Sequence, residues 1–352
     1  MPSPTRLLWE PAIYEHKAAL IGRSPGEVAV SADLLLEALE AEHRIYGADF
    51  MTVGLDVYNV EAEACGAELA AGGRDACPEI PVPLWSMEAL PAELQAGELA
   101  PPDPETSGRF PLLLEAAERF RDRLADSAGP AASRGSPGAS PTVRVAASGP
   151  VSIAAKLVGT EPLLMGLFGA EPPVLALLEF TTAICLAWTA AIRAAKLDAI
   201  VFDSSASPPM TGPDLYREAI EPLHARIMSR LAETGQTVRP LVLGGDTTPI
   251  AARLAATGAT QLVCDYTADA AGFADALVGC VPAASNGISV RRNVRPALLC
   301  GADLTAAVAD FCDDLSRLPR PVAGTGILPY DQDPAEYLAF RRLVEEGLEG
   351  SL

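Results

Sequence analysis

Short apolar runs rich in β-branched residues alternate eight times with longer segments of helical apolar spacing. Such alternation predicts parallel strands joined by helices, because two parallel strands need a long crossover connection. The strands are predicted at residues 6–9, 50–55, 142–147, 199–202, 240–243, 261–264, 288–292 and 321–323. Eight such units in 352 residues predict an α/β fold, a (β/α)8 TIM barrel, with residues 1–352 forming a single domain.

A long insertion, at about residues 101–141, separates the second predicted strand from the third. A helix is expected at about residues 111–125, and another at residues 31–46 outside the insertion. Residues 128–141 are mostly Gly, Ser, Ala and Pro, a composition typical of a mobile loop. The insertion is therefore expected to be flexible, either as a lid over the barrel rim or as a surface loop.

The formal net charge of -20 argues against nucleic acid and anionic membranes as partners, since both require basic patches. The seven cysteines are scattered without metal-ligand spacing and are expected to be free thiols in a reducing cytoplasm. Residues 174–192 are nearly all apolar and close to bilayer length. A helix buried against the sheet is favoured over a membrane span, because polar residues interrupt the stretch and a strand pattern follows it. The N-terminus lacks an apolar signal core, so a cytoplasmic protein is expected.

The residues predicted at the C-terminal strand ends matter most, because chemistry in a TIM barrel takes place there. They are Glu10, Asp56, Ser148, Asp203 with Ser204, Asp246, Asp265 with Tyr266, Arg292 with Asn293, and Gly324 with Thr325. Five of these eight ends carry a carboxylate, which predicts an electronegative rim whose negative charge is compensated only by Lys156 and Arg292. Clustered acids could bind a cation such as magnesium, neutralise a cationic substrate or supply general acid/base catalysis. Helix capping is the structural alternative for Asp203, Asp246 and Asp265.

Among the histidines, His16 follows the first strand on the rim side and is the best placed for proton transfer. His43 and His224 fall within amphipathic helices and are expected to be packing or surface residues.

Six segments carry a family resemblance. In chain order they read GRSPGEVAVSADLLLEALEAEHRIYGADFMTVGLDVYNVEAEACG, ASGPVSIAAKLVG, DAIVFDSSASPPMTGPDLYREAIEPLHARI, LVLGGDTTPI, LVCDYTADAA and GTGILP. Together they resemble the uroporphyrinogen decarboxylase superfamily, which implies its TIM-barrel fold. One branch decarboxylates tetrapyrroles, and the other contains zinc-dependent methyltransferases that move a methyl group between a corrinoid and a thiol.

The resemblance departs from both branches at their functional positions. In the methyltransferases, one imidazole and two thiolates hold the zinc. The matching positions here are Val242, Gly244 and Thr325, whose side chains do not bind zinc, so no zinc is expected at the family site. Glu10 stands where the decarboxylases place arginines for substrate carboxylates, and Lys156 stands where they place a tyrosine.

Two decarboxylase positions look retained, since Asp56 lies near the family's catalytic aspartate and Ser204 matches its Asp-Ser strand end. The first functional hypothesis is transfer or cleavage of a small carbon (methyl) unit at the carboxylate-lined rim without the family zinc. The second is decarboxylation of a small carboxylic acid or a tetrapyrrole, with Asp56 as the acid/base and Lys156 binding the carboxylate. The third is a non-catalytic binding protein.

The candidate catalytic residues are Asp56, His16 and Asp246. The candidate substrate-binding residues are Glu10, Lys156, Asp203, Ser204, Asp265, Tyr266, Arg292 and Thr325. A corrinoid or a divalent cation such as magnesium is a candidate cofactor. A small molecule is the expected substrate, and a corrinoid protein and a second copy of the chain, as a homodimer, are candidate partners.

Overall fold

The structure, a computed structural model, describes residues 6–127, 140–278, 287–301 and 303–349. Its parallel strands form two sheets of four, in the order β1-β8-β7-β6 and β2-β3-β4-β5. The strands are β1 (Leu8–Ala12), β2 (Phe50–Val53), β3 (Thr142–Ser148), β4 (Asp198–Phe202), β5 (Leu241–Val242), β6 (Gln261–Cys264), β7 (Ser289–Val294) and β8 (Pro321–Ile327). All eight predicted strands are therefore confirmed, with shifts at their ends.

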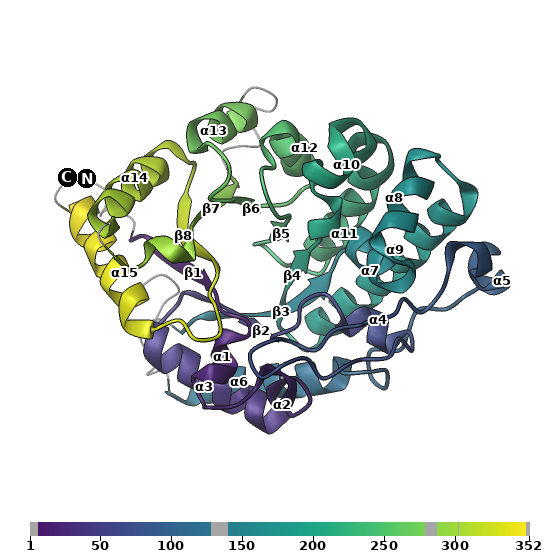
Figure 1. The fold of residues 1–352 in the computed structure, drawn as a ribbon, viewed down its shortest axis with the longest axis horizontal. Helices are drawn as coiled ribbons and strands as arrows, with labels where there is room; N and C mark the ends of the chain where they lie inside the picture. Colours follow the sequence, from purple (N-terminus) through teal and green to yellow (C-terminus); the bar gives the residue numbers. More distant parts are fainter. Residues whose placement is uncertain (1–5, 128–139, 279–286, 302, 350–352) are drawn as a thin grey trace.

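The two sheets meet at two seams. At the first seam, Pro240 just before β5 pairs in parallel with Gln261 of β6. At the second, Asp49 joins β1 to the start of β2, because its amide donates to the Trp9 carbonyl (2.9 Å) and its Oδ2 accepts from the Trp9 amide (2.8 Å). Figure 1 shows the strands around the centre and the helices outside them. The predicted α/β fold is confirmed, although the strand ladders among the described residues form two sheets rather than one continuous ring.

The helices fill the outer layer. They are α1 (His16–Ala19), α2 (Pro25–Ala29), α3 (Ala32–Tyr46), α4 (Val60–Ala64), α5 (Ala92–Gln95), α6 (Phe110–Ser127), α7 (Pro150–Val158), α8 (Thr160–Phe168), α9 (Pro172–Ala194), α10 (Pro208–Leu215), α11 (Glu221–Glu233), α12 (Ala251–Ala256), α13 (Ala270–Val278), α14 (Leu304–Arg317) and α15 (Pro334–Glu349). The helix expected at residues 31–46 is α3, whose first turn is capped by the Ser31 hydroxyl and whose end is Gly47 in the left-handed region (φ 52°).

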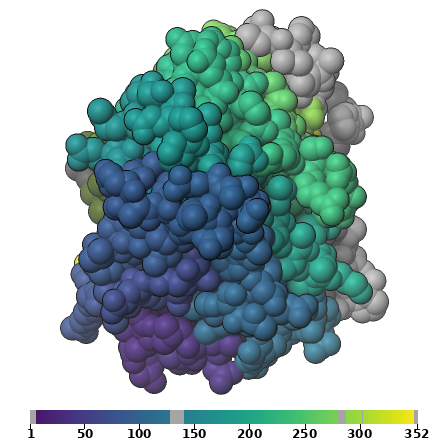
Figure 2. Space-filling view, turned by 90° about the vertical axis from the view of Figure 1, so that its right-hand side faces the viewer, coloured from purple at the N-terminus to yellow at the C-terminus, as the bar shows by residue number. Residues whose placement is uncertain are grey.

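The segment between β2 and β3 contains α4, α5 and α6; of these, α6 lies in the insertion at about residues 101–141 and is the helix expected at residues 111–125. Of the predicted mobile loop, residues 128–139 lie outside the described residues. Figure 2 shows residues of the segment between β2 and β3, in blue, across the centre of the face that carries α5 and α8.

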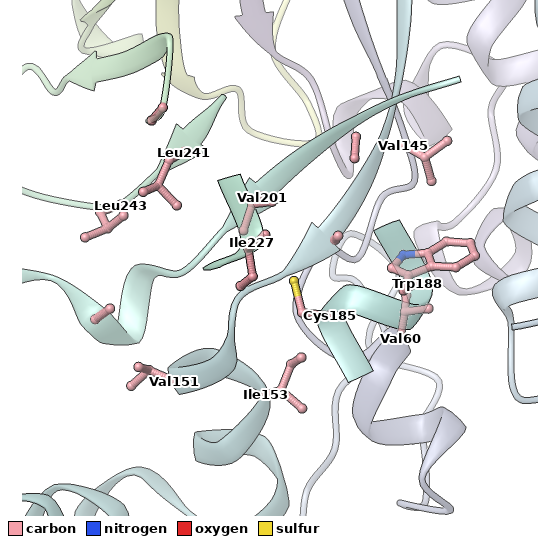
Figure 3. Close-up of a cluster of buried hydrophobic side chains, with 14 of the residues drawn as sticks. Val60, Val145, Val151, Ile153, Cys185, Trp188, Val201, Ile227, Leu241 and Leu243 are labelled. Atoms are coloured by element: carbon pink, nitrogen blue, oxygen red, sulfur yellow. The ribbon is translucent and has the colours of Figure 1, made fainter. Parts of the chain in front are cut away.

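By length and composition, helix α9 could cross a membrane. Among the described residues, the bent pair α7 and α8, counted as one span, also meets this criterion, and no other helix does. Helix α9 packs on the sheet, where Trp188 Nε1 donates to the carbonyl of Ala146 in β3 (3.0 Å). Trp188 also stacks on Phe110 of α6, with ring centroids 4.3 Å apart. Figure 3 shows Val145 and Val201 of the sheet beside Cys185 and Trp188 of this helix. The prediction of a helix buried against the sheet is confirmed.

Candidate functional site

A cavity of about 380 Å³ opens beside the C-terminal end of β4. The residues lining it are Tyr58, Ile80, Pro81, Pro83, Ser152, Ala155, Lys156, Gly159, Thr160, Ser204 and Ser205. They come from the segment after β2, helix α7, the start of α8, and the short 3-10 helix η2 (Ser204–Ala206) that follows β4. Two predicted substrate-binding residues, Lys156 and Ser204, are thus brought together in one cavity at the end of the barrel where chemistry is expected.

Lys156 is the charged residue among those lining the cavity, and the lining includes no Asp or Glu. No ion pair among the described residues involves Lys156. The other polar groups are hydroxyls, including that of Tyr58, which is hydrogen-bonded to Ser204 Oγ. Burial raises the pKa of Tyr58, so its phenol stays protonated at neutral pH. The cavity therefore offers one free cation and several hydrogen-bond donors, a set that suits an anion.

Asp203 lies next to this cavity but is completely buried. Its carboxylate accepts hydrogen bonds from the amides of Ser152 (2.7 Å) and Val151 (3.3 Å) and faces His224 Nε2 (2.9 Å). The carboxylate therefore caps α7, rather than a helix that follows Asp203 directly. No exposed surface of Asp203 is left for the substrate contact predicted from the sequence.

Glu10 lies inside the barrel rather than on its rim. Its two carboxylate oxygens accept from Arg291 Nη1 (2.9 Å) and Arg144 Nη1 (3.0 Å), and Gln261 Nε2 also donates to it (2.7 Å). Burial raises the pKa of Glu10, but the two guanidinium groups outweigh it and hold the pKa below its usual value. A buried cluster of one carboxylate and two guanidiniums thus links strands β1, β3, β6 and β7.

Asp56 is also paired. Its Oδ2 accepts from Arg109 Nη2 (2.8 Å) and its Oδ1 from Asn59 Nδ2 (2.8 Å), while Arg109 also pairs with Glu63. Arg109 comes from the residue before α6, so the insertion neutralises this strand-end acid. Asp56 does not line the cavity, and its catalytic role stays a prediction.

The remaining two carboxylates hold their own turns. Asp246 is exposed and its Oδ1 accepts from the amide of Thr248 (2.9 Å). Asp265 accepts in the same way from Thr267, through the amide (3.1 Å) and the hydroxyl (2.9 Å). Tyr266 is 37% exposed and lies outside the cavity. The five carboxylates do not form one electronegative pocket, because three of them are buried with donors or cations.

Arg292 does not line the cavity. It binds Asp314 of α14 through Nε (2.8 Å) and Nη2 (2.6 Å), and donates through Nη1 to the carbonyl of Asp265 (2.6 Å). Thr325 is completely buried within β8, where its Oγ1 accepts from the amide of Ala12 (3.0 Å). The Arg292 contact holds β7 against α14, and the Thr325 contact holds β8 against β1.

His16 is buried between α3 and the segment after β8. Its Nε2 lies 2.6 Å from the Tyr46 hydroxyl and its Nδ1 lies 2.9 Å from the Tyr330 carbonyl. Burial lowers the pKa of His16, so the ring is neutral at pH 7. Both nitrogens are occupied and the residue does not line the cavity, although its predicted catalytic role is not tested by this placement.

The residues at the relatives' zinc position do not suit zinc. Val242 is aliphatic and packs against an apolar cluster that contains Phe202, Gly244 has no side chain, and the Thr325 hydroxyl already accepts a backbone hydrogen bond. Within residues 6–127, 140–278, 287–301 and 303–349, no three or more His, Cys, Asp or Glu side chains gather as a potential metal site. The donor chemistry of these positions therefore offers neither the thiolates nor the imidazole that zinc prefers.

Several functional candidates were missed from the sequence. Glu61 is buried, its carboxylate accepts from the Ser148 amide (2.6 Å) and hydroxyl (2.7 Å), and burial raises its pKa to about 7. Glu61 lies in VEAEACG, the end of the first segment that carries the family resemblance, and its place next to apolar residues is the signal that could have identified it. Arg144 and Arg291 were also missed; Arg144 interrupts an apolar strand, a pattern that indicates a buried charge with a partner, whereas Arg291 lies in the polar run of β7 and gives no such signal.

Comparison with known proteins agrees with this geometry. The family model described as uroporphyrinogen decarboxylase (URO-D) matches residues 11–314. A solved methyltransferase from Methanosarcina mazei is similar in fold, with a TM-score of 0.77 over 99% of this chain and 95% of that chain, at 18% sequence identity. A search of curated proteins gave no match. With the family model covering most of its length, the chain belongs to the uroporphyrinogen decarboxylase family.

Proposed function

We propose that this protein is an enzyme that binds a small carboxylate at Lys156 and cleaves a one-carbon unit from it as carbon dioxide. The observation that carries the proposal is the unpaired Lys156 ammonium in a cavity whose walls include no carboxylate. An ammonium that lacks a protein counter-ion in a partly enclosed site favours an anionic ligand. The small volume, about 380 Å³, favours a small acid over a tetrapyrrole.

The wall residues suit a decarboxylation. Lys156 anchors one carboxylate of a dicarboxylic substrate, and Ile80 and Pro83 give the second, reacting carboxylate apolar surroundings, which favour its departure as neutral carbon dioxide. The bond to the carboxyl carbon breaks and its electron pair stays on the neighbouring carbon, as an enolate if the substrate is a 3-oxo acid. Tyr58, held protonated by burial and hydrogen-bonded to Ser204, donates the proton that completes the product, and water reprotonates the phenolate.

Methyl transfer to a thiol is the second candidate, supported by the fold shared with the methyltransferase. The side chains at Val242, Gly244 and Thr325 do not fit the zinc that activates the thiol in such relatives, and we therefore favour decarboxylation.

A ligand panel tests the proposal. Malonate and acetoacetate are expected to raise the melting temperature, because a ligand at 100 times its Kd stabilises the folded state by about 2.7 kcal/mol. Lys156→Gln should abolish this shift, while the control Lys196→Gln, which changes an exposed lysine, should keep it. Release of carbon dioxide from oxaloacetate, a 3-oxo acid with two carboxylates, above the uncatalysed rate tests the reaction itself.

Stabilisation by methylated amines, with none by carboxylates, would overturn the proposal. Binding of both acids at Lys156 without turnover of any 3-oxo acid would leave a non-catalytic binding protein. Stabilisation by a polycarboxylated tetrapyrrole alone would return the chain to tetrapyrrole chemistry.

A further inference from the structure

We propose that Tyr216, His224 and Asp203 form a buried relay that positions helix α7 and, through it, the Lys156 cavity. The inference rests on the proposed function for the identity of the cavity's ligand. The sequence predicts a packing or surface role for His224 and a substrate contact for Asp203, whereas the structure joins both residues to Tyr216. Its three residues act through α7 and are therefore positioning residues.

The relay consists of two hydrogen bonds that join Tyr216 to His224 and His224 to Asp203. All three side chains are completely buried. His224 Nε2 lies 2.9 Å from Asp203 Oδ2, and His224 Nδ1 lies 3.1 Å from the Tyr216 hydroxyl. Because a carboxylate only accepts, Nε2 carries a proton and donates to Asp203; in the neutral imidazole, Nδ1 then accepts from the Tyr216 O–H. Every polar atom of the imidazole thus has a partner, and the ring is fixed in one tautomer.

The relay ends on the first turn of α7. Asp203 accepts from the amides of Val151 and Ser152, two of the donors that a helix leaves unpaired at its start. Ser152 in turn accepts, through Oγ, from the amide of Ser205 (3.2 Å). The carboxylate therefore fixes α7 against η2, and both elements contribute polar residues to the lining of the cavity.

Gly149 shows how closely α7 and Asp203 approach. A Cβ built on Gly149 would lie 2.4 Å from Asp203 Cβ and 2.5 Å from Asp203 Oδ2. Only glycine permits this approach, because any other residue would push the start of α7 away from the carboxylate. Lys156 is four residues beyond Ser152, one helical turn, so a displaced first turn moves the ammonium as well.

An irregular helical segment places Tyr216 on His224. Helix α10 contains Gly212 at φ 71°, and a π-helix follows at Tyr216–Ile220 before α11 begins. A π-helix is rare and marks functional positions more often than other helices do. Here the extra residue per turn lets a tyrosine eight positions before the histidine reach its ring.

The test compares His224→Leu, which removes both hydrogen bonds, with His224→Gln, which keeps a donor near Nε2. We expect His224→Leu to weaken malonate binding about 10-fold, the effect of losing one cap-sized interaction. His224→Gln should restore most of that affinity, and Tyr216→Phe should give an intermediate loss. The control is Lys196→Gln, which changes an exposed lysine.

Two ligand-independent measurements separate the relay from the proposed function. Hydrogen exchange of residues 150–158 should accelerate in His224→Leu more than exchange in the outer helices α14 and α15. With lysines methylated by ¹³C-formaldehyde, the NMR signal of Lys156 should move while that of Lys196 stays in place. If the wild-type protein binds no carboxylate, the proposed function fails while these two measurements still decide the relay.

Two results would overturn the relay. One is uniform acceleration of exchange throughout the barrel with an unmoved Lys156 signal, which indicates a purely global effect on stability. The other is unchanged exchange at residues 150–158 in the folded variant. If His224→Leu does not fold, Tyr216→Phe and His224→Gln are measured in the same way, and wild-type behaviour of both would refute the proposal.

Discussion

Replacing Glu10 with glutamine should destabilise the barrel strongly. The substitution keeps the size of the side chain but leaves Arg144 and Arg291 buried without their shared counter-ion. Loss of one partner from a buried ion pair costs about 3–5 kcal/mol, because the remaining charge is uncompensated. With an unfolding entropy of about 2.1 cal/mol/K per residue, 352 residues give roughly 0.7 kcal/mol/K. The melting temperature should therefore fall by about 4–7 °C.

Scanning calorimetry of Glu10→Gln and the wild type at pH 7 measures this effect. The matched control is Glu179→Gln, because Glu179 pairs with Arg226 on the surface, with 60% and 44% of their side chains exposed. An exposed pair contributes about 0–1 kcal/mol, so the control should melt within about 1 °C of the wild type. A Glu10→Gln variant that melts as the control does would refute the assignment of Glu10 as the counter-ion of the barrel interior.

Three further predictions concern pH, packing and metal. The folded-state pKa of Glu61 is raised from 4.5 to about 7, so its contribution to stability is complete below the unfolded pKa and is lost as pH rises to 7. Measured by urea unfolding, the free energy of unfolding of the wild type should fall by about 3 kcal/mol between pH 4.5 and 7 because of this group, and Glu61→Gln should lack that fall. Parallel curves of unfolding free energy against pH for the two proteins would contradict the burial of an ionisable carboxyl. Gly149→Ala should lower the free energy of unfolding by about 1–3 kcal/mol, because the new Cβ meets Asp203, whereas Gly287→Ala, with open space around it, should be nearly neutral in the same urea assay. Protein produced with added zinc should retain no stoichiometric zinc after dialysis, and elemental analysis that finds one zinc per chain would reveal a site made by other ligands.

The strands were predictable because each is a short apolar run between breakers, and the errors have a physical origin. Strand β8 was expected to end at Ala323 but continues to Ile327. Gly324 looked like the start of a loop, yet it is a strand residue that must lack a side chain. A Cβ there would lie 2.8 Å from Cγ and Cδ of Arg291. A glycine that makes room for an interior side chain looks the same in a sequence as a glycine that begins a turn.

The site was predictable only in part. Lys156 and Ser204 share a cavity, as expected of two strand-end segments. The prediction of one electronegative pocket was wrong, because the sequence gives the position of each carboxylate in the chain but not the side chain that it contacts. Glu10 meets Arg291 across 281 positions of sequence, and Asp56 meets Arg109 across 53. Such partners depend on strand register and on the path of the insertion, which local spacing does not encode.

The position of β1 in the sheet also determines how the chain must be made. Leu8 of β1 lies opposite Val322 of β8, and 322 - 8 = 314 positions separate them. A ribosome that adds 5–20 residues per second needs roughly 15–60 s to cover that distance. During this time the first strand, with Trp9 and Glu10, has neither its β8 neighbour nor the Arg291 guanidinium. The nascent chain therefore carries β1 without its β8 neighbour throughout that interval, and a strand made before the other seven described strands is among the last to reach its place.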